Sequence, residues 1–381
     1  MSLKKDNTVY IDRCETYDIE NLIAILRKRF EELGAFEKIK PGMTVVIKPN
    51  LIMKADPNSG IITHPLVTAA VGILVKECGA SVLIAESSGG IFTEQSVKAV
   101  MKGSGYTEIA EKYGFSIYTE CESTQVELPD GVICKTLTVI NPYINADFII
   151  DIAKLKSHCM TMLSGATKNL FGTVPGLMKP ELHFRYPEKE PFSSMLVDLC
   201  EFIRPDLCII DAVDALEGDG PTGGQKRHVG LLMCSESPYS LDVCAAEIIG
   251  MKPMDVLMLR EANRRGLCPA GSEDIPVEGA EIKDLVINDY VMPKSKSVDF
   301  AGWVPAFMRP LIKKITTPKP KINTKLCIGC GKCAESCPRH TIKIVDRKAH
   351  IDYSQCIKCF CCHEMCPKHV IDVKRFSLFN L

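Results

Sequence analysis

The sequence predicts an α/β protein: a mostly parallel sheet with helices on both faces, followed by a small α+β module rich in cysteine. The first 290 or so residues alternate short β-rich runs with amphipathic stretches that end at glycine. Because the β-rich runs are almost continuously apolar, they are typical of parallel strands buried on both faces. Nine of the 19 cysteines lie between Cys327 and Cys366, which sets the C-terminal module apart.

The expected strands and helices follow one another along the large domain. The strands are expected at residues 43–48, 81–87, 147–154, 206–213 and 228–234, and the helices at 19–34, 64–79 and 241–250. In the helix at 64–79, Pro65 suits the first turn, Lys76 the last turn and Gly79 the C-terminal cap. Ligands bind such sheets at the C-terminal ends of the strands, so we expect the functional residues in the loops there.

The chain divides into a large domain at residues 1–292, a linker at 293–321, the cysteine-rich module at 322–374 and an apolar tail at 375–381. The linker holds seven Lys or Arg and five prolines, and the prolines interrupt any long helix. Trp303 near its centre favours docking on a domain or, as the alternative, contact with a membrane surface. We expect the tail to pack against the body.

The overall charge excludes a strongly basic or acidic protein. Lys and Arg total 46 against 47 Asp and Glu, so we expect no nucleic-acid partner. The N-terminus has no apolar run of signal-peptide length, and no segment reaches the roughly eighteen apolar residues of a spanning helix. We expect a cytoplasmic protein, in which clustered thiols bind metal rather than form disulfides. The oligomeric state stays open, a homodimer included.

The cysteines of the module follow one spacing twice. Residues 327–338 and 356–367 each read C-x2-C-x2-C-x3-C-P. This spacing lets three thiolates bind one face of an iron–sulfur cube while the fourth reaches a neighbouring cube. The alternatives are zinc, which takes pairs of ligands, and disulfides. Two adjacent cubes would pass electrons one at a time between a donor at the surface and an acceptor elsewhere.

Residues 322–374 resemble the bacterial two-cluster ferredoxin module. The resemblance implies two 4Fe-4S clusters, with ligands Cys327, Cys330, Cys333 and Cys366 for one cluster and Cys356, Cys359, Cys362 and Cys337 for the other. Cys361 falls outside the pattern, and we interpret it as a packed thiol.

In the large domain, the segment 153–186 concentrates basic side chains and glycines directly after an expected strand. Cations beside glycine-rich backbone favour a small anionic ligand such as a carboxylate or phosphate, whereas the alternative is a solvated basic loop. Lys48 and Asn50 follow another strand and are expected at the same place. The candidate catalytic residues are Lys168, His158 and His183, and the candidate substrate-binding residues are Lys48, Asn50, Lys154, Lys156, Ser164 and Gly165.

Other polar residues near expected strand ends have two interpretations. Asp211, Asp214 and Glu217 are interpreted either as site residues, which would bind a cation or act as a base, or as helix caps. His64 either caps a helix or belongs to the site. No GxGxxG follows the first expected strand, so a bound nicotinamide is not indicated.

Five segments, VIKPNLI, ITHPLV, AKLKSH, SGATKNLFGTVPG and EGDGPTGG, resemble the family of domain of unknown function 362, which is often fused to a two-cluster ferredoxin module. The resemblance implies this architecture and iron–sulfur binding, without a reaction. Ser164, Gly165, Lys168, Pro175, Gly176 and His183 resemble the lactate racemase loop, in which a lysine anchors a nickel pincer cofactor and a histidine binds the metal. Ala166 replaces a glycine of that family, so only the shared cavity of Lys168 and His183 is carried over.

Three hypotheses follow. The leading one is an iron–sulfur oxidoreductase that takes electrons from a redox protein such as a ferredoxin and delivers them to a small anionic, unsaturated or carbonyl substrate. There the lysines bind the anion and a histidine supplies the proton. The second is a non-catalytic electron-transfer subunit. The third is a redox-neutral isomerase or lyase that uses the racemase-like loop.

Overall fold

The structure is a computed structural model that describes residues 7–294 and 317–374. Trp303, most of the predicted linker and the predicted tail at 375–381 lie outside the described residues. Within that range, none of the helices is long and apolar enough to cross a membrane.

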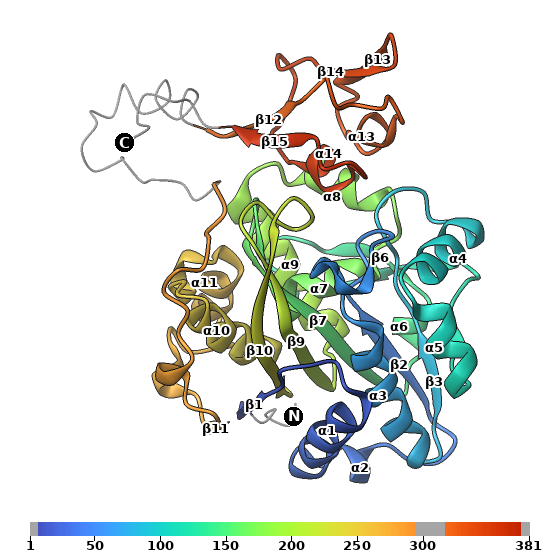
Figure 1. Ribbon diagram of the computed structural model, residues 1–381, viewed down its shortest axis with the longest axis vertical. Helices are drawn as coiled ribbons and strands as arrows, with labels where there is room; N and C mark the ends of the chain where they lie inside the picture. Colours follow the sequence, from blue (N-terminus) through green and yellow to red (C-terminus); the bar gives the residue numbers. More distant parts are fainter. Residues whose placement is uncertain (1–6, 295–316, 375–381) are drawn as a thin grey trace.

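A nine-stranded sheet forms the centre of the large domain (Figure 1). In spatial order its strands are β11 (Val277–Gly279), β1 (Val9–Arg13), β10 (Gln225–Ser235), β9 (Leu207–Glu217), β7 (Phe148–His158), β2 (Thr44–Pro49), β3 (Ser81–Ile84) and β4 (Ser116–Ile117), with β8 (Met162–Ser164) paired to β7. The strands from β9 to β4 are parallel, whereas β10 runs antiparallel to both β9 and β1. The predicted, mostly parallel sheet is confirmed; its antiparallel end was not predicted.

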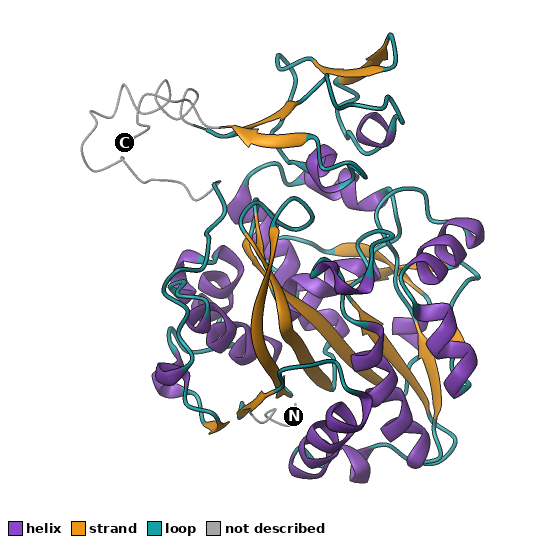
Figure 2. Cartoon of the chain, viewed as in Figure 1, coloured by secondary structure: helices purple, strands orange, loops and turns teal. Residues whose placement is uncertain are grey.

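Helices cover both faces of this sheet, as predicted (Figure 2). They are α1 (Ile19–Glu32), α2 (Ala35–Lys38), α3 (Pro65–Glu77), α4 (Glu94–Gly103), α5 (Tyr106–Tyr113), α6 (Pro142–Asn145), α7 (Ala166–Asn169), α8 (Met178–Arg185), α9 (Lys189–Ile203), α10 (Pro238–Ile248) and α11 (Leu257–Arg264). Along β7, Ile150 and Ile152 belong to the apolar core shared with α1, α3 and α5. Ile149 and Ala153 belong to the core shared with α9, α10 and α11, which is the alternation of a strand buried on both faces. A separate hairpin pairs β5 (Ser123–Glu127) with β6 (Thr136–Ile140).

The C-terminal module is a small α+β unit, as predicted. β12 (Lys319–Ile322) pairs with β15 (Ile371–Lys374), β13 (Ile342–Val345) pairs with β14 (Lys348–Ile351), and two short helices, α13 (Lys332–Glu335) and α14 (Cys361–Glu364), lie between the strands. Residues 319–321, expected at the end of the linker, therefore form part of a strand. The module sits over the C-terminal end of β7, and α14 is its nearest element to the large domain (Figure 1).

The strand β7 is longer than expected. It runs to His158, so Lys154, Lys156 and His158 lie inside a fully buried strand and not in the loop that follows it. Successive side chains of a strand alternate between its two faces, and these three therefore share one face. The neighbouring strand β9 also extends beyond its predicted end, to Glu217.

Candidate active site

A cavity of about 80 Å³ lies between the large domain and the module. Its walls come from the end of β7, from α7 and α8, from the loops after β2 and β3, and from α14. The polar residues that line it are Asn50, Glu86, Ser87, Lys156, His158, Ser164, Lys168, Asn169, Lys179 and His183 of the large domain, and Ser336, Cys361 and Glu364 of the module. The space is large enough for several water molecules or one small ligand.

Lys156 is buried in this wall without a carboxylate partner among the described residues. Its Nζ donates to Asn50 Oδ1 at 2.7 Å and to the carbonyl oxygen of Ile61 at 2.8 Å. Burial, with the nearby charge of Lys168, lowers the pKa of Lys156 to about 7. The ammonium is therefore only partly charged at neutral pH, and an anion in the cavity would favour its charged form.

Lys154 and Lys48 are placed differently from Lys156. Lys154 Nζ donates to Asp211 Oδ2 at 3.0 Å and to Tyr17 Oη at 2.7 Å, and it does not line the cavity. Lys48 pairs with Glu86 at 2.6 Å, and both side chains are buried. Glu86 lines the cavity and Lys48 lies behind it, so neither predicted lysine contacts this space directly.

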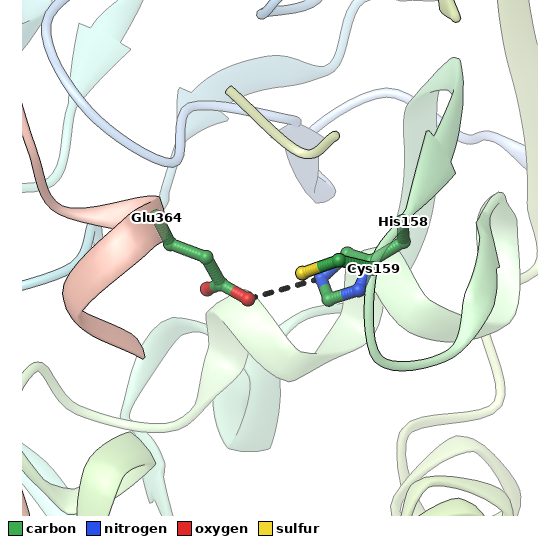
Figure 3. Close-up of side chains that lie close together, drawn as sticks. All are labelled: His158, Cys159 and Glu364. Atoms are coloured by element: carbon green, nitrogen blue, oxygen red, sulfur yellow. Dashed lines mark ion pairs between the residues drawn. The ribbon is translucent and has the colours of Figure 1, made fainter. Parts of the chain in front are cut away.

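His158 is fixed in one tautomer by the turn that follows β7. Its Nδ1 accepts the backbone N–H of Met160 at 3.0 Å and that of Thr161 at 3.3 Å. The proton of the neutral ring therefore sits on Nε2, which faces Glu364 Oε1 of the module at 3.2 Å (Figure 3). Burial lowers the pKa of His158 to about 4, so the ring is neutral at pH 7.

The tautomer decides whether a metal ion fits here. The ligand atoms of His158, Cys159 and Glu364 lie within 4.8 Å of one another, a spacing that suits a metal ion. A metal-binding Nε2 requires the proton on Nδ1, with an acceptor for it. Here two N–H donors face Nδ1, so these residues do not fit a metal site; His158 instead contacts the module.

Lys168 and His183 line the same cavity. The Nζ of Lys168 lies 4.9 Å from the centre of the Phe171 ring, and among the described residues no hydrogen bond or ion pair reaches it. His183 stacks on Phe192 with the ring centres 4.2 Å apart, and its buried Nδ1 has no hydrogen-bond partner. Burial lowers the pKa of His183 to about 3 and also lowers that of Lys168.

Ser164 lines the cavity, whereas Gly165 does not. The carboxylate of Asp242 fills the space beside Gly165 and accepts the first two N–H groups of α7, those of Ala166 at 2.6 Å and Thr167 at 2.9 Å. A Cβ on Gly165 would lie 1.9 Å from Asp242 Oδ1. Gly165 thus makes room for a helix cap, and the helix N-terminus already holds an anion of the protein itself.

Sequence reasoning missed Glu86, Asn169, Glu364 and the cavity-facing position of Cys361. Glu86 lies two residues after the end of β3, but the predicted strand at 81–87 included it, so the rule of strand ends did not select it. Asn169 accepts from Asn50 at 2.8 Å and donates to Asp151 at 2.8 Å, which fixes the amide of Asn50 against Lys156. No sequence signal identifies Glu364 and Cys361, because their position depends on how the two domains dock.

The other acidic candidates lie on β9 and do not line the cavity. Asp211 is bound by Lys154, Asp214 pairs with Lys226 at 3.3 Å, and Glu217 accepts the N–H of Val291 at 3.0 Å. His64 caps α3 by accepting the N–H of Leu66 at 3.3 Å.

In the module, the cysteines lie around two further cavities. One is lined by Cys327, Cys330, Cys333 and Cys366, and the other by Cys337, Cys356, Cys359 and Cys362. Cys327 Sγ accepts backbone N–H groups from Gly329 and Ala349 at 3.4 Å, and Cys337 Sγ accepts one from Thr341 at 3.4 Å. The first cavity has four thiols and the second has these four and Cys361. With amide N–H groups directed at sulfur, four thiols in each cavity fit the ligand set of a 4Fe-4S cluster. Cys361 lines both the second of these cavities and the cavity of the large domain.

The docking of the module rests on direct contacts. His363 Nε2 lies 2.8 Å from the carbonyl oxygen of Asp219, and Thr222 Oγ1 donates to the carbonyl oxygen of Glu364 at 3.2 Å. A Cβ on Gly223 would lie 2.5 Å from His363 Cε1, so the loop after β9 approaches the module closely.

Comparisons with known proteins agree with this architecture. The model of a domain of unknown function (DUF362) matches residues 45–247, and that of a 4Fe-4S dicluster domain matches residues 319–367. The thylakoid-associated protein sll1697 of Synechocystis sp. is 32% identical over 289 residues, which cover 75% of this chain and 88% of that protein. The lactate racemase apoprotein of Thermoanaerobacterium thermosaccharolyticum aligns with a TM-score of 0.38 and 14% identity over 62% of this chain, which spans about half (55%) of that protein. The chain belongs to the DUF362 family and carries a C-terminal iron–sulfur domain of the ferredoxin type.

Proposed function

We propose that this protein is an iron–sulfur oxidoreductase in which two 4Fe-4S clusters deliver electrons to a small anionic substrate in the cavity. The observation that carries the proposal is the position of Cys361, which lines both the second cysteine cavity and the large-domain cavity. Only one side chain would then separate a cluster from the substrate. When bound, the clusters supply single electrons.

The charges in the cavity favour an anion. Three lysines, Lys156, Lys168 and Lys179, line it, against the carboxylates of Glu86 and Glu364. Glu86 is already neutralised by Lys48. The net positive charge is therefore left for a ligand, and Lys168, which has no partner among the described residues, is the side chain assigned to bind its carboxylate or phosphate.

Lysine is better suited than histidine to supply the protons that accompany the electrons. Burial lowers the pKa of Lys156 and of Lys179 to about 7, which is close to the working pH expected of a general acid. Burial keeps His158 and His183 neutral at that pH. Their role in the proposal is to position the substrate, with His158 held by the N–H groups of Met160 and Thr161 and its Nε2 3.2 Å from Glu364 Oε1.

The test uses the full-length protein, purified and reduced with dithionite without oxygen, to which fumarate or pyruvate is added as an unsaturated or a carbonyl probe. Re-oxidation of the clusters is followed by visible absorbance and electron paramagnetic resonance. We expect about eight irons per chain, from two clusters of four, and re-oxidation by at least one probe. Lys168→Ala should remove this reaction at unchanged iron content, whereas the surface variant Lys112→Ala should retain it.

The contrary outcomes identify the other candidates. A probe that binds and is converted without re-oxidising the clusters would indicate a redox-neutral enzyme. Probes that neither bind nor react, together with intact clusters that reduce another protein, would indicate an electron-transfer subunit.

A further inference from the structure

One end of the module carries an exposed apolar surface. Leu326, Ile328 and Val345 are 62%, 49% and 51% exposed, and Ile344 is 38% exposed. Among the 19 cysteines, all of them within the described residues, Cys330 alone is classed as exposed. The hairpin of β13 and β14, which carries Ile344 and Val345, points away from the large domain (Figure 1). We call the end of the module that carries Leu326, Ile328, Ile344 and Val345 the outer face.

The outer face is continuous with the first cysteine cavity. Ile328 and Ile344 line this cavity together with Cys330. The turn of the hairpin packs on the cysteine loop, since a Cβ on Gly329 would lie 2.4 Å from the carbonyl oxygen of Arg347. Lys348 Nζ donates to the carbonyl oxygen of Cys327 at 2.7 Å. Ile328 and Ile344 therefore lie beside Cys330, the exposed thiol of a predicted cluster.

The charge around the outer face is positive. The described part of the module, residues 317–374, holds eleven Lys or Arg against five Asp or Glu, although the whole chain has a net charge of −1. Lys325, Lys332, Lys343 and Arg347 are exposed, and all but Lys332 lie within two residues of Leu326, Ile344 or Val345 in the sequence. Asp346, between Val345 and Arg347, is an exposed carboxylate among them, so the cationic side chains still outnumber it. Lys332 has a carboxylate partner, Glu335 at 3.2 Å. Bound clusters would add negative charge inside the module, but a partner protein meets the cationic side chains first.

The two cysteine cavities differ in the part of the protein that they face. Cys330 of the first is exposed at the outer face, whereas Cys361 and α14 bring the second against the large-domain cavity. Electrons that reach the substrate cavity through the module would therefore enter at the outer face.

We infer that the outer face docks an acidic single-electron carrier protein, which reduces the cluster bound by Cys327, Cys330, Cys333 and Cys366. The inference rests on the proposed function, because it assigns the entry point for the electrons used there. In each encounter the carrier loses one electron and the cluster gains one, and no bond forms or breaks. An apolar centre with a cationic rim fits a carrier whose own apolar contact patch is ringed by carboxylates.

The experiment measures the rate at which photoreduced flavodoxin, an acidic carrier, reduces the oxidised full-length protein in anaerobic stopped flow. The wild-type rate should fall steeply with ionic strength, because salt screens the attraction. At low salt, the double variant Lys343→Glu, Arg347→Glu should be slower by about tenfold or more, and the two rates should converge at high salt. Val345→Ser should be slower at every ionic strength. The matched control is Lys374→Glu, exposed at the end of β15, which should retain the wild-type rate.

Dithionite reduction and iron content report whether each variant keeps its clusters, and re-oxidation by fumarate or pyruvate reports the substrate cavity separately. If the substrate probes do not re-oxidise the clusters, but flavodoxin still reduces them at a salt-dependent rate, the proposed function is contradicted and the inference about the outer face is retained.

Three results would overturn the inference. They are a rate of reduction by flavodoxin that does not depend on salt, equal rates in the wild type and the double variant, and no reduction by flavodoxin. A second experiment tests binding to a membrane surface by sedimentation with phosphatidylglycerol vesicles. If the protein sediments with the vesicles at low salt, and Lys343→Glu, Arg347→Glu abolishes this binding without changing the rate with flavodoxin, the outer face binds a membrane and the inference is overturned.

Discussion

A side chain at position 165 is predicted to destabilise the protein, because Asp242 fills the space beside Gly165. In Gly165→Ala, the new Cβ would lie 1.9 Å from Asp242 Oδ1, far inside van der Waals contact, so the carboxylate must leave its position. It then loses the N–H groups of Ala166 and Thr167, at 2.6 and 2.9 Å. Hydrogen bonds to a charged group contribute about 1.5–3 kcal/mol each, so we expect a loss of about 3–5 kcal/mol after partial relaxation.

Thermal unfolding of the full-length protein at pH 8 measures this loss. Burial raises the pKa of Asp242 to about 6, so the carboxylate is ionised at that pH. For a domain of this size, about 2 °C is expected per kcal/mol, which gives a decrease in Tm of about 6–10 °C. Gly103→Ala is the control, because its nearest atoms are Cε, Cδ and Cγ of Lys54, a flexible side chain that can move aside, so little change is expected.

A double-mutant cycle separates the clash from any other effect. In an Asp242→Ala background the carboxylate is absent, so Gly165→Ala should then cost much less than in the wild type. Additive losses, or an unchanged Tm in the single variant, would refute the reasoning. An unchanged Tm with weakened anion binding would return Gly165 to the substrate-binding role that the sequence predicted.

Three further predictions concern the cavity and its links to the module. Anion binding, measured by calorimetry with sulfate, whose charge is constant in this range, should weaken as the pH rises from about 6 to 8, because Lys156 and Lys179 lose charge near pH 7 while Glu86 faces them; constant affinity would contradict this assignment. Cys359→Ser should lower the iron content, whereas Cys361→Ser should preserve it and slow re-oxidation by the substrate probe; iron loss in Cys361→Ser alone would exchange the two roles. Gly223→Val should displace the module by its clash with His363, increase the radius of gyration in small-angle scattering and leave cluster absorbance intact; an unchanged radius with full re-oxidation would contradict the docking.

The parallel part of the fold and the spacing of the cysteines could be predicted because both signals are local. An apolar run followed by a capped helix identifies a buried strand, as at β2 and α3. The antiparallel end could not be predicted, since β1 is five residues long and pairs with β10 more than 200 residues later. Local sequence carries no record of such a partner.

Lys154 and Lys156 show why the partners of individual side chains could not be predicted from the sequence. Both follow the same pattern along β7, and both were expected to bind substrate. Lys154 lies opposite Asp211 of β9, and a shift in register directly after it places Lys156 opposite Leu216. One lysine therefore has a carboxylate beside it and the other has none. This difference depends on the pairing of two strands, which the spacing of lysines within one strand does not specify.

The unsatisfied groups of the cavity connect the fold to the proposed chemistry. Buried polar atoms are nearly always hydrogen-bonded, because leaving one unpaired costs about 1–3 kcal/mol. Here the buried His183 Nδ1 has no partner. Lys168 is only half-buried, and its Nζ has no hydrogen-bond or ion-pair partner among the described residues. A ligand that accepts a hydrogen bond from Lys168 and satisfies His183 Nδ1 would recover the cost at the histidine on binding. Since Ser336, Cys361 and Glu364 complete the same walls from the module, loss of the module would open the cavity and remove three of its polar groups. A redox-neutral reaction confined to the large domain would survive that loss, whereas the electron-delivering reaction proposed here would not.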